Sequence, residues 1–254
     1  MQSTTWAVVT GASSGLGVHF AERLASDGSN LILVARSVDK LETLAERLSL
    51  AHGVRAEVRQ VDLSDAAQRA ALADELATLQ VHTLINNAGF GSMGNFDQLD
   101  RGRLLSEIAV NATALTELSH AVVGRMLAHG RGAIVNVAST AAFQPIPTMA
   151  VYAATKSYVL RLSLALWEEL HPTGVRVLAV CPGPTETEFF ATAGNDQAMR
   201  WRRTPEQVID TTFEALSAHR PYVVDGWNNR ALSLATRFAP TWLTVKLARR
   251  IAGG

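Results

Sequence analysis

The stretch Thr10-Gly11-Ala12-Ser13-Ser14-Gly15-Leu16-Gly17 lies between a short apolar run and a segment with helical periodicity. Its three glycines allow the backbone to turn tightly and to approach a pyrophosphate without an intervening Cβ atom. The helix that follows would offer free N–H groups and the positive end of its dipole to that phosphate. An ordinary glycine-rich turn is the alternative, but the place between strand and helix favours a dinucleotide-binding loop.

Around this loop the chain alternates between short β-branched runs and longer helical patterns. The expected strands are 6–10, 31–35, 54–61, 83–87, 133–138, 175–181 and 222–224, and helical patterns include 38–50, 65–79, 101–128 and 152–170. This alternation predicts right-handed βαβ units and a parallel sheet. We find no linker and no internal repeat in the sequence. We expect one α/β domain over residues 1–254, a Rossmann-type doubly wound fold with about seven parallel strands and helices on both faces.

Composition narrows the class of protein. The chain has 254 residues with 23 basic and 23 acidic side chains, so it has no general attraction to nucleic acid or to anionic membranes. No stretch reaches the roughly 18 apolar residues of a membrane span, and no signal peptide is evident. The one cysteine, Cys181, permits no intrachain disulfide and reads as a buried thiol at a strand end. We expect a cytoplasmic protein without a metal site.

Two regions interrupt the alternation. Residues 184–204 form a long connection after a predicted strand, and such connections are often functional lids. Residues 226–254 are helical in pattern and combine Trp227, Phe238 and Trp242 with several basic residues. We expect this C-terminal extension to pack on its own domain, and docking on a partner or on a membrane surface is the alternative.

The end of the second predicted strand bears on the identity of the cofactor. In dinucleotide sites, an acid about 20 residues after the glycines usually binds the ribose 2′-hydroxyl. Here the strand ends in Leu33-Val34-Ala35-Arg36-Ser37, with an arginine and no acid. Arg36 could pair with a 2′-phosphate, and the Ser13 hydroxyl could add a hydrogen bond. This favours NADP(H) over NAD(H), whereas a solvated loop cation is the alternative role for Arg36.

Two further strand ends fit the same groove. Asp62, followed by Leu63, closes the third predicted strand and could accept the adenine amino group. Asn86-Asn87-Ala88-Gly89 closes the fourth. Its small residues permit close approach of the backbone, and its Asn side chains can tie neighbouring loops together.

A second group of residues predicts proton transfer. Tyr152 and Lys156 lie four residues apart at the start of a helical pattern, so they share one helix face. A free tyrosine has a pKa of about 10, and a nearby ammonium would lower it, which would let Tyr152 exchange a proton with a substrate oxygen. Ser139, at the end of the fifth strand, could hold the same oxygen. Asn111, within 101–128, could hold a water that links Lys156 to solvent.

In order and context these residues resemble the short-chain dehydrogenase/reductase family. The match runs from about Thr5 to Thr187 and includes Thr10–Gly17, Asp62, Asn86–Gly89, Asn111, Ser139, Tyr152–Lys156, Pro182-Gly183, Thr185 and Thr187. The resemblance implies hydride transfer at nicotinamide C4, with Tyr152 as acid/base and Ser139 as anchor of the substrate oxygen. It also implies that Lys156 binds the nicotinamide ribose and tunes Tyr152, and that Asn111 completes a proton relay.

The resemblance also implies the cofactor contacts and the assembly. Thr187, with the backbone near Thr185, would hold the carboxamide. The family often forms dimers or tetramers through the helices at 101–128 and 152–170, so we expect a homodimer or homotetramer. The expected cofactor-binding residues are Gly11, Ser13, Ser14, Gly15, Leu16, Gly17, Arg36, Asp62, Leu63, Asn87, Ala88, Gly89, Tyr152, Lys156, Pro182, Gly183, Thr185 and Thr187.

The substrate is less constrained by the sequence. Segments 87–91 and 221–227 are similar to a broad bacterial subgroup with poorly defined substrates. We expect an NADP(H)-dependent oxidoreductase that interconverts a carbonyl and a secondary alcohol on a hydrophobic small molecule. A non-catalytic NADP(H)-binding sensor or scaffold of the same fold is the alternative, although a sensor would not need all four residues of the predicted catalytic group. Expected pocket residues are Thr140, Ala141, Phe143, Pro145 and Met149, with Phe189, Phe190 and Trp201 from 188–201.

Overall fold

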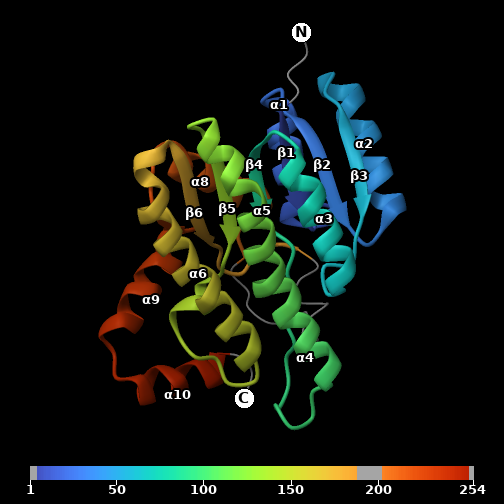
Figure 1. Ribbon diagram of the computed structural model, residues 1–254. Helices are drawn as coiled ribbons and strands as arrows, with labels where there is room; N and C mark the ends of the chain where they lie inside the picture. Colours follow the sequence, from blue (N-terminus) through green and yellow to red (C-terminus); the bar gives the residue numbers. More distant parts are fainter. Residues whose placement is uncertain (1–4, 188–201, 252–254) are drawn as a thin grey trace.

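The computed structural model describes residues 5–187 and 202–251, and within them seven parallel strands form one sheet (Figure 1). The spatial order is β3-β2-β1-β4-β5-β6-β7, which confirms the predicted Rossmann-type fold. The order reverses between β1 and β4, so their carboxyl ends flank the crevice where ligands bind in open α/β sheets. The strands are β1 (Trp6–Thr10), β2 (Asn30–Ala35), β3 (Ala56–Gln60), β4 (Val81–Asn86), β5 (Gly132–Val137), β6 (Val175–Cys181) and β7 (Tyr222–Val224).

Helices cover both faces of the sheet (Figure 1). On one face lie α1 (Leu16–Ser26), α2 (Val38–His52) and α8 (Pro205–Ser217). On the other lie α3 (Ala66–Thr78), α5 (Leu115–Ala128) and α6 (Ala150–Leu170). The other helical elements of the described residues are α4 (Arg101–Ile108), the π-helical turn η1 (Ala109–Ala114), the 3₁₀ turns η2 (Thr140–Phe143) and η3 (His171–Thr173), α9 (Trp227–Phe238) and α10 (Thr241–Ile251).

The sheet is apolar on both faces because it is buried between two helical layers. Along β1, Val9 packs in a cluster with Phe20 of α1, whereas its neighbour Val8 packs in another with Leu118 of α5. Strands buried on both faces read as continuous apolar runs rather than alternating ones. This explains why the strands could be found from the sequence as β-branched runs.

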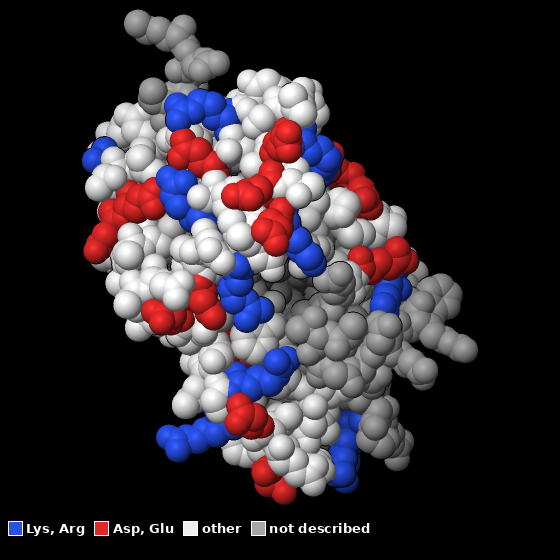
Figure 2. Space-filling model, turned by 90° about the vertical axis from the view of Figure 1, so that its right-hand side faces the viewer, with Lys and Arg blue, Asp and Glu red and all other residues white. Residues whose placement is uncertain are grey.

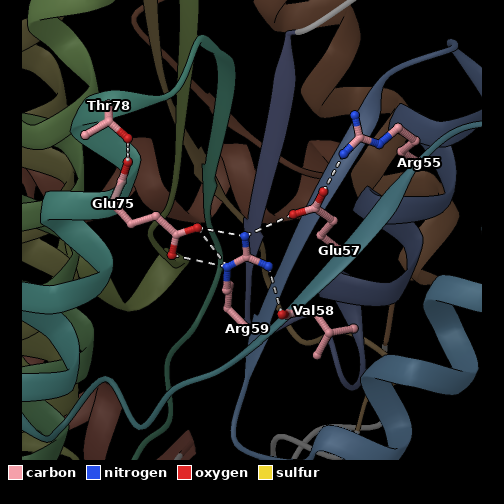
Figure 3. Close-up of polar contacts among 6 residues, drawn as sticks. All are labelled: Arg55, Glu57, Val58, Arg59, Glu75 and Thr78. Carbon is pink, nitrogen blue, oxygen red and sulfur yellow. Dashed lines mark hydrogen bonds and ion pairs between the residues drawn. The ribbon is translucent and has the colours of Figure 1, made fainter.

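The edge strand β3 combines charged side chains with the apolar Ala56 and Val58, which pack against the core. Arg59 donates from Nε to Oε1 of Glu75 on α3 at 2.9 Å, and from Nη2 to Oε2 of Glu57 at 3.0 Å (Figure 3). Arg55 donates to the other oxygen of Glu57 at 2.7 Å. Figure 2 shows basic and acidic side chains interleaved over this side of the molecule. Charge along an edge strand opposes pairing with a strand of another molecule.

The two irregular regions have different outcomes. Within the connection predicted as a lid, residues 188–201, with Phe189, Phe190 and Trp201, lie outside the described residues. The C-terminal extension is helical as expected, and α9 packs against η2 and β7. Several of its large apolar side chains are nevertheless exposed. Over the described ranges, no helix has both the length and the apolar character needed to cross a membrane.

Candidate functional site

A cavity of about 1060 Å³ opens at the carboxyl ends of the central strands. Residues from every motif singled out above contribute to its lining or lie directly behind it. The lining includes Gly11, Ser13, Ser14, Gly15, Leu16, Arg36, Asp62, Leu63, Asn87, Ala88, Gly89, Ser139, Tyr152, Lys156, Pro182, Gly183, Thr185 and Thr187. Gly17 and Asn111 do not line the cavity themselves, but they contact the lining residues Gly11 and Phe90, respectively.

The glycine loop is built for close approach. Gly11 and Gly15 have φ values of +65° and +53°, a region that side-chain-bearing residues rarely adopt. A Cβ at Gly11 would lie 2.9 Å from Cα of Ala88. Gly15 is the N-cap of α1 and offers no capping side chain, so the first N–H groups of this helix are available to an anion. The loop therefore fits a phosphate group.

Hydrogen bonds join the glycine loop to the turn after β4. The hydroxyl of Thr10 accepts from the backbone N–H groups of Asn87 and Ala88, both at 3.0 Å. In return, Nδ2 of Asn87 donates to the carbonyl oxygens of Thr10 and Gly11, at 2.9 and 3.2 Å. The expected tie between loops is confirmed, and Thr10 is a supporting residue that the predicted cofactor contacts lacked.

The far end of the cavity is basic with one carboxylate. Arg36 and Ser13 both line it, and so does Lys40, a second cation that was not among the expected cofactor contacts. Asp62 accepts hydrogen bonds from the hydroxyl and the N–H of Ser64, at 2.7 and 2.9 Å. These bonds, with a smaller contribution from Arg36, lower the pKa of Asp62 and keep it ionised at neutral pH. Lys40 could have been found from its place in the first turn of α2, close to Arg36.

At the other end, Ser139, Tyr152 and Lys156 converge. Tyr152 and Lys156 lie on the buried face of the first turns of α6, and Ser139 follows β5. The Ser139 hydroxyl is hydrogen-bonded to the Tyr152 phenol and accepts from the N–H of Ala141 at 3.1 Å. Lys156 donates from Nζ to the carbonyl oxygen of Val137 at 2.8 Å, and its Nζ lies 5.7 Å from the centroid of the Tyr152 ring.

Burial dominates the electrostatics of this group. It raises the pKa of Tyr152 to about 12, against the opposing hydrogen bond from Ser139. It lowers the pKa of Lys156 to about 8. The pKa of Tyr152 is therefore raised and not lowered as expected, because desolvation of the phenolate is the largest influence. Tyr152 keeps its proton throughout the neutral range.

Asn111 lies in the π-helical turn η1, and such turns often mark functional sites. Its Oδ1 accepts from the N–H of Phe90 at 3.1 Å. Its Nδ2 donates to the carbonyl oxygen of Phe90 at 2.9 Å and to Oγ1 of Thr155 at 3.1 Å. The side chain thus fixes the loop after β4 to α6, and the proposed water relay stays a prediction.

Two further contributions to the site were not found from the sequence. Glu107 of α4 is fully buried one turn before Asn111. Burial raises its pKa, whereas Ser92, Arg103 and Lys156 oppose this rise. Glu107 lies four residues before Asn111 in an otherwise apolar helical pattern. This spacing places both residues on one helix face and could have indicated that Glu107 is buried near the site. In addition, one face of α9 lines the cavity through Asn229, Leu232, Ser233 and Thr236, whose helical spacing in the sequence could have indicated a shared face.

The expected substrate pocket is largely present among the described residues. Thr140, Ala141, Phe143 and Met149 line the cavity, as predicted. Pro145 does not belong to the lining, whereas its neighbour Ile146 does. Phe90 adds a further apolar wall.

The two described ends of the connection after β6 are held together. Thr185 forms a parallel bridge with Arg203, whose N–H donates to the carbonyl oxygen of Pro184 at 2.9 Å. The Arg203 guanidinium binds the carboxylate of Asp225 through two hydrogen bonds of 2.9 Å each. Thr187 lies against the glycine loop. A Cβ atom added at Gly15 would be 3.2 Å from Cγ2 of Thr187.

Comparison with known proteins agrees with this arrangement. Residues 5–198 match the family model described as short chain dehydrogenase. Sulfoacetaldehyde reductase of Chromohalobacter salexigens is 40% identical over 196 residues, which are 75% of this chain and 76% of that protein. A short-chain dehydrogenase from Sphingobium yanoikuyae in complex with NADPH has a TM-score of 0.85 and 37% identity, and the match covers 92% of this chain and 94% of that one. The bulky-bulky ketone specific alcohol dehydrogenase from Comamonas testosteroni has a TM-score of 0.80 and 31% identity, and the match covers 94% and 96%.

Proposed function

Because the chain belongs to the short-chain dehydrogenase family, we propose that it is an NADP(H)-dependent oxidoreductase that interconverts a carbonyl compound and a secondary alcohol. The observation that carries this proposal is the convergence of Ser139, Tyr152 and Lys156 at one end of a cavity whose other end holds the glycine loop and Arg36. A single site thus offers both an anion-binding loop and a proton donor.

The residues present fit NADP(H). Glycines without Cβ atoms and the open N-terminus of α1 suit a pyrophosphate, and Asp62 suits the adenosine half. Arg36 and Lys40 would pair with the 2′-phosphate. The NADPH bound in the similar Sphingobium yanoikuyae structure supports this choice. When bound, the nicotinamide supplies or accepts the hydride, and Thr187 with Thr185 would hold its carboxamide.

In the direction of reduction, Tyr152 would donate its phenolic proton to the carbonyl oxygen. Its raised pKa keeps that proton in place at neutral pH. A pKa this high also makes the free phenol a weak acid, so proton donation depends on stabilisation of the phenolate as it forms. Ser139 would hold the same oxygen, since its hydroxyl already bonds to Tyr152. The Lys156 ammonium would stabilise the phenolate that remains. Asn111 would hold the Phe90 loop against this group and complete the proton path.

We further propose a hydrophobic substrate. Phe90, Phe143, Ile146, Met149 and Leu232 give the substrate end of the cavity an apolar, partly aromatic lining. The similarity to a bulky-bulky ketone specific alcohol dehydrogenase supports a ketone of this kind. A panel of carbonyl compounds in which only small charged members are reduced would contradict this part of the proposal.

We also propose that the protein is a cytoplasmic homodimer or homotetramer. The free, buried thiol of Cys181 suits a reducing compartment. Leu105 and Ile108 of α4 and Tyr158 of α6 are exposed on the helices through which the family often assembles.

The replacement of Tyr152 by Phe tests the proposed chemistry, because it removes the hydroxyl and keeps the ring. We expect turnover with NADPH to fall by about 10²-fold or more, while NADPH binding, followed by cofactor fluorescence, is retained. Tyr158→Phe is the matched control, since it removes a phenolic hydroxyl from the same helix that does not line the cavity and bonds to Thr116 instead. Unchanged turnover in Tyr152→Phe would refute the role. A wild type that binds NADPH and reduces no carbonyl in a broad panel would point to a sensor instead.

A further inference from the structure

The segment from α9 to α10 differs from the rest of the chain in charge. Residues 227–251 contain no Asp or Glu, and their basic residues are Arg230, Arg237, Lys246, Arg249 and Arg250. The remainder of this electrically neutral chain therefore has five more acidic than basic residues. The two C-terminal helices extend beyond β7 along one end of the molecule (Figure 1). Positive charge is thus concentrated on one projecting part of the fold.

The same helices expose large apolar side chains in an ordered pattern. On α9, Trp227, Leu234 and Phe238 stand at positions i, i+7 and i+11, which places them on one side of the helix. Trp227 is 80% exposed and Phe238 is 87% exposed, and Leu234 is also exposed. Arg230 is exposed as well, next to this stripe. The stripe is an aromatic surface with a basic border.

Helix α10 repeats the combination. Trp242 is 63% exposed, and Leu243 and Leu247 are exposed beside it. The ammonium of Lys246 lies 5.5 Å from the centroid of the Trp242 ring. Both helices therefore expose aromatic and basic side chains.

We propose that α9 and α10 form a docking surface for a membrane with anionic lipids. Trp and Phe side chains suit the boundary between headgroups and acyl chains, and Arg and Lys suit anionic headgroups. A second copy of the chain fits this surface less well. In a symmetric contact between equivalent arms, each basic surface would face another that contains no acid.

Docking in this way would place the cavity next to the lipid. The face of α9 opposite the Trp227 stripe lines the cavity through Asn229, Leu232, Ser233 and Thr236. A hydrophobic carbonyl compound dissolved in the membrane would then have a short path to Tyr152. This consequence rests on the proposed function, whereas the docking itself does not.

Vesicle flotation of the full-length protein with NADPH tests the proposal. The vesicles are phosphatidylcholine alone or phosphatidylcholine mixed with phosphatidylglycerol. One variant combines Trp227→Ser, Phe238→Ser and Trp242→Ser, and another combines Arg230→Gln, Lys246→Gln and Arg249→Gln. Leu50→Ser is the matched control, because Leu50 of α2 is 81% exposed on the body of the protein. Far-UV circular dichroism and NADPH binding check that each variant is folded.

We expect wild type and Leu50→Ser to float with the anionic vesicles and not with the neutral ones, and added salt to release them. Three basic residues near an anionic surface correspond to roughly a hundredfold in affinity, so the charge variant should lose most binding.

The proposal would be overturned if the wild type failed to float, or if the aromatic and charge variants floated as well as the wild type. A fall in solution mass of the aromatic variant without any lipid binding would also overturn it and would assign the surface to a second copy. NADPH turnover of the wild type, measured separately, shows whether the proposed function fails on its own. If a variant unfolds, the flotation of the wild type as a function of lipid charge and salt still tests the proposal.

Discussion

The carbonyl oxygen of Gly11 packs directly against Gly17, and a Cβ atom at position 17 would overlap it. This contact holds the first turn of α1 against the end of β1, so that the helix N-terminus faces the cavity. Gly17 lies within the helix and has no positive φ, so it is required for space rather than for an unusual backbone conformation. Gly11, in contrast, is required for both reasons.

Gly17→Ala should therefore weaken NADPH binding by at least about tenfold and destabilise the protein by about 1–3 kcal/mol, since a backbone oxygen must move. Fluorescence titration and thermal unfolding measure the two effects. Gly124→Ala is the control, because a Cβ there meets no atom within 4 Å. In the middle of α5 it should instead stabilise by roughly 0.5–1 kcal/mol. If Gly17→Ala and Gly124→Ala had equal effects on NADPH binding and stability, the packing of Gly17 against Gly11 would not be the cause.

Arg36→Asp tests the preference for NADP(H). Loss of a hydrogen bond between charged groups costs about 1.5–3 kcal/mol, so the KM for NADPH should rise roughly 10- to 100-fold. Lys40 remains in place and limits the loss. The KM for NADH should not rise, because NADH has no 2′-phosphate. Steady-state kinetics with both cofactors check this, with Arg161→Asp on the exposed side of α6 as control. Parallel changes for NADPH and NADH would indicate that Arg36 does not contact the 2′-phosphate.

The sequence predicted those features that depend on local spacing. The glycine loop, Arg36 and the Tyr152–Lys156 pair are each read from a few adjacent residues, and the alternation of strands and helices predicted the sheet. The pKa of Tyr152 could not be predicted in this way, because it depends on burial by tertiary packing. The same holds for the contact of α9 with the cavity, which arises from residues far apart in sequence.

The contribution of Lys156 to the stability of the cofactor-free protein should rise with pH in the alkaline range. Its pKa is about 8 when folded, lowered by burial from an ordinary value of 10.5. Between these values the unfolded chain binds more protons, so the contribution of Lys156 to stability is lowest below pH 8 and increases as the pH rises towards 10.5. In Lys156→Met this contribution is absent. The difference in unfolding free energy should therefore shift in favour of the wild type by up to about 3 kcal/mol.

Urea unfolding of both proteins on either side of this pH window measures the shift. The raised pKa values of Cys181 and Tyr152 act in the opposite sense above their ordinary values of 9.0 and 10. Both groups are present in both proteins, so the comparison removes most of their effect. Lys246→Met, on an exposed position of α10, is the matched substitution. The lowered pKa of Lys156 would be contradicted if the difference in unfolding free energy between wild type and Lys156→Met did not change with pH.

The ion pair between Arg203 and Asp225 should be important for stability. The Asp225 side chain is fully buried, whereas Arg203 is 34% exposed. Arg203→Met would leave a buried carboxylate without its cation, which costs about 3–5 kcal/mol. Asp225→Asn should cost less, because an amide is cheaper to bury and Arg203 can turn towards water. Chemical denaturation compares both with Arg220→Met, the replacement of an exposed arginine near the end of α8.

The same ion pair should also affect turnover. It joins the segment that follows residues 188–201 to the end of β7, and Arg203 bridges to Thr185 at the cavity wall. Arg203→Met should therefore displace Thr185 and impair NADPH turnover. An Arg203→Met protein as stable as Arg220→Met would show that solvent compensates for the lost partner.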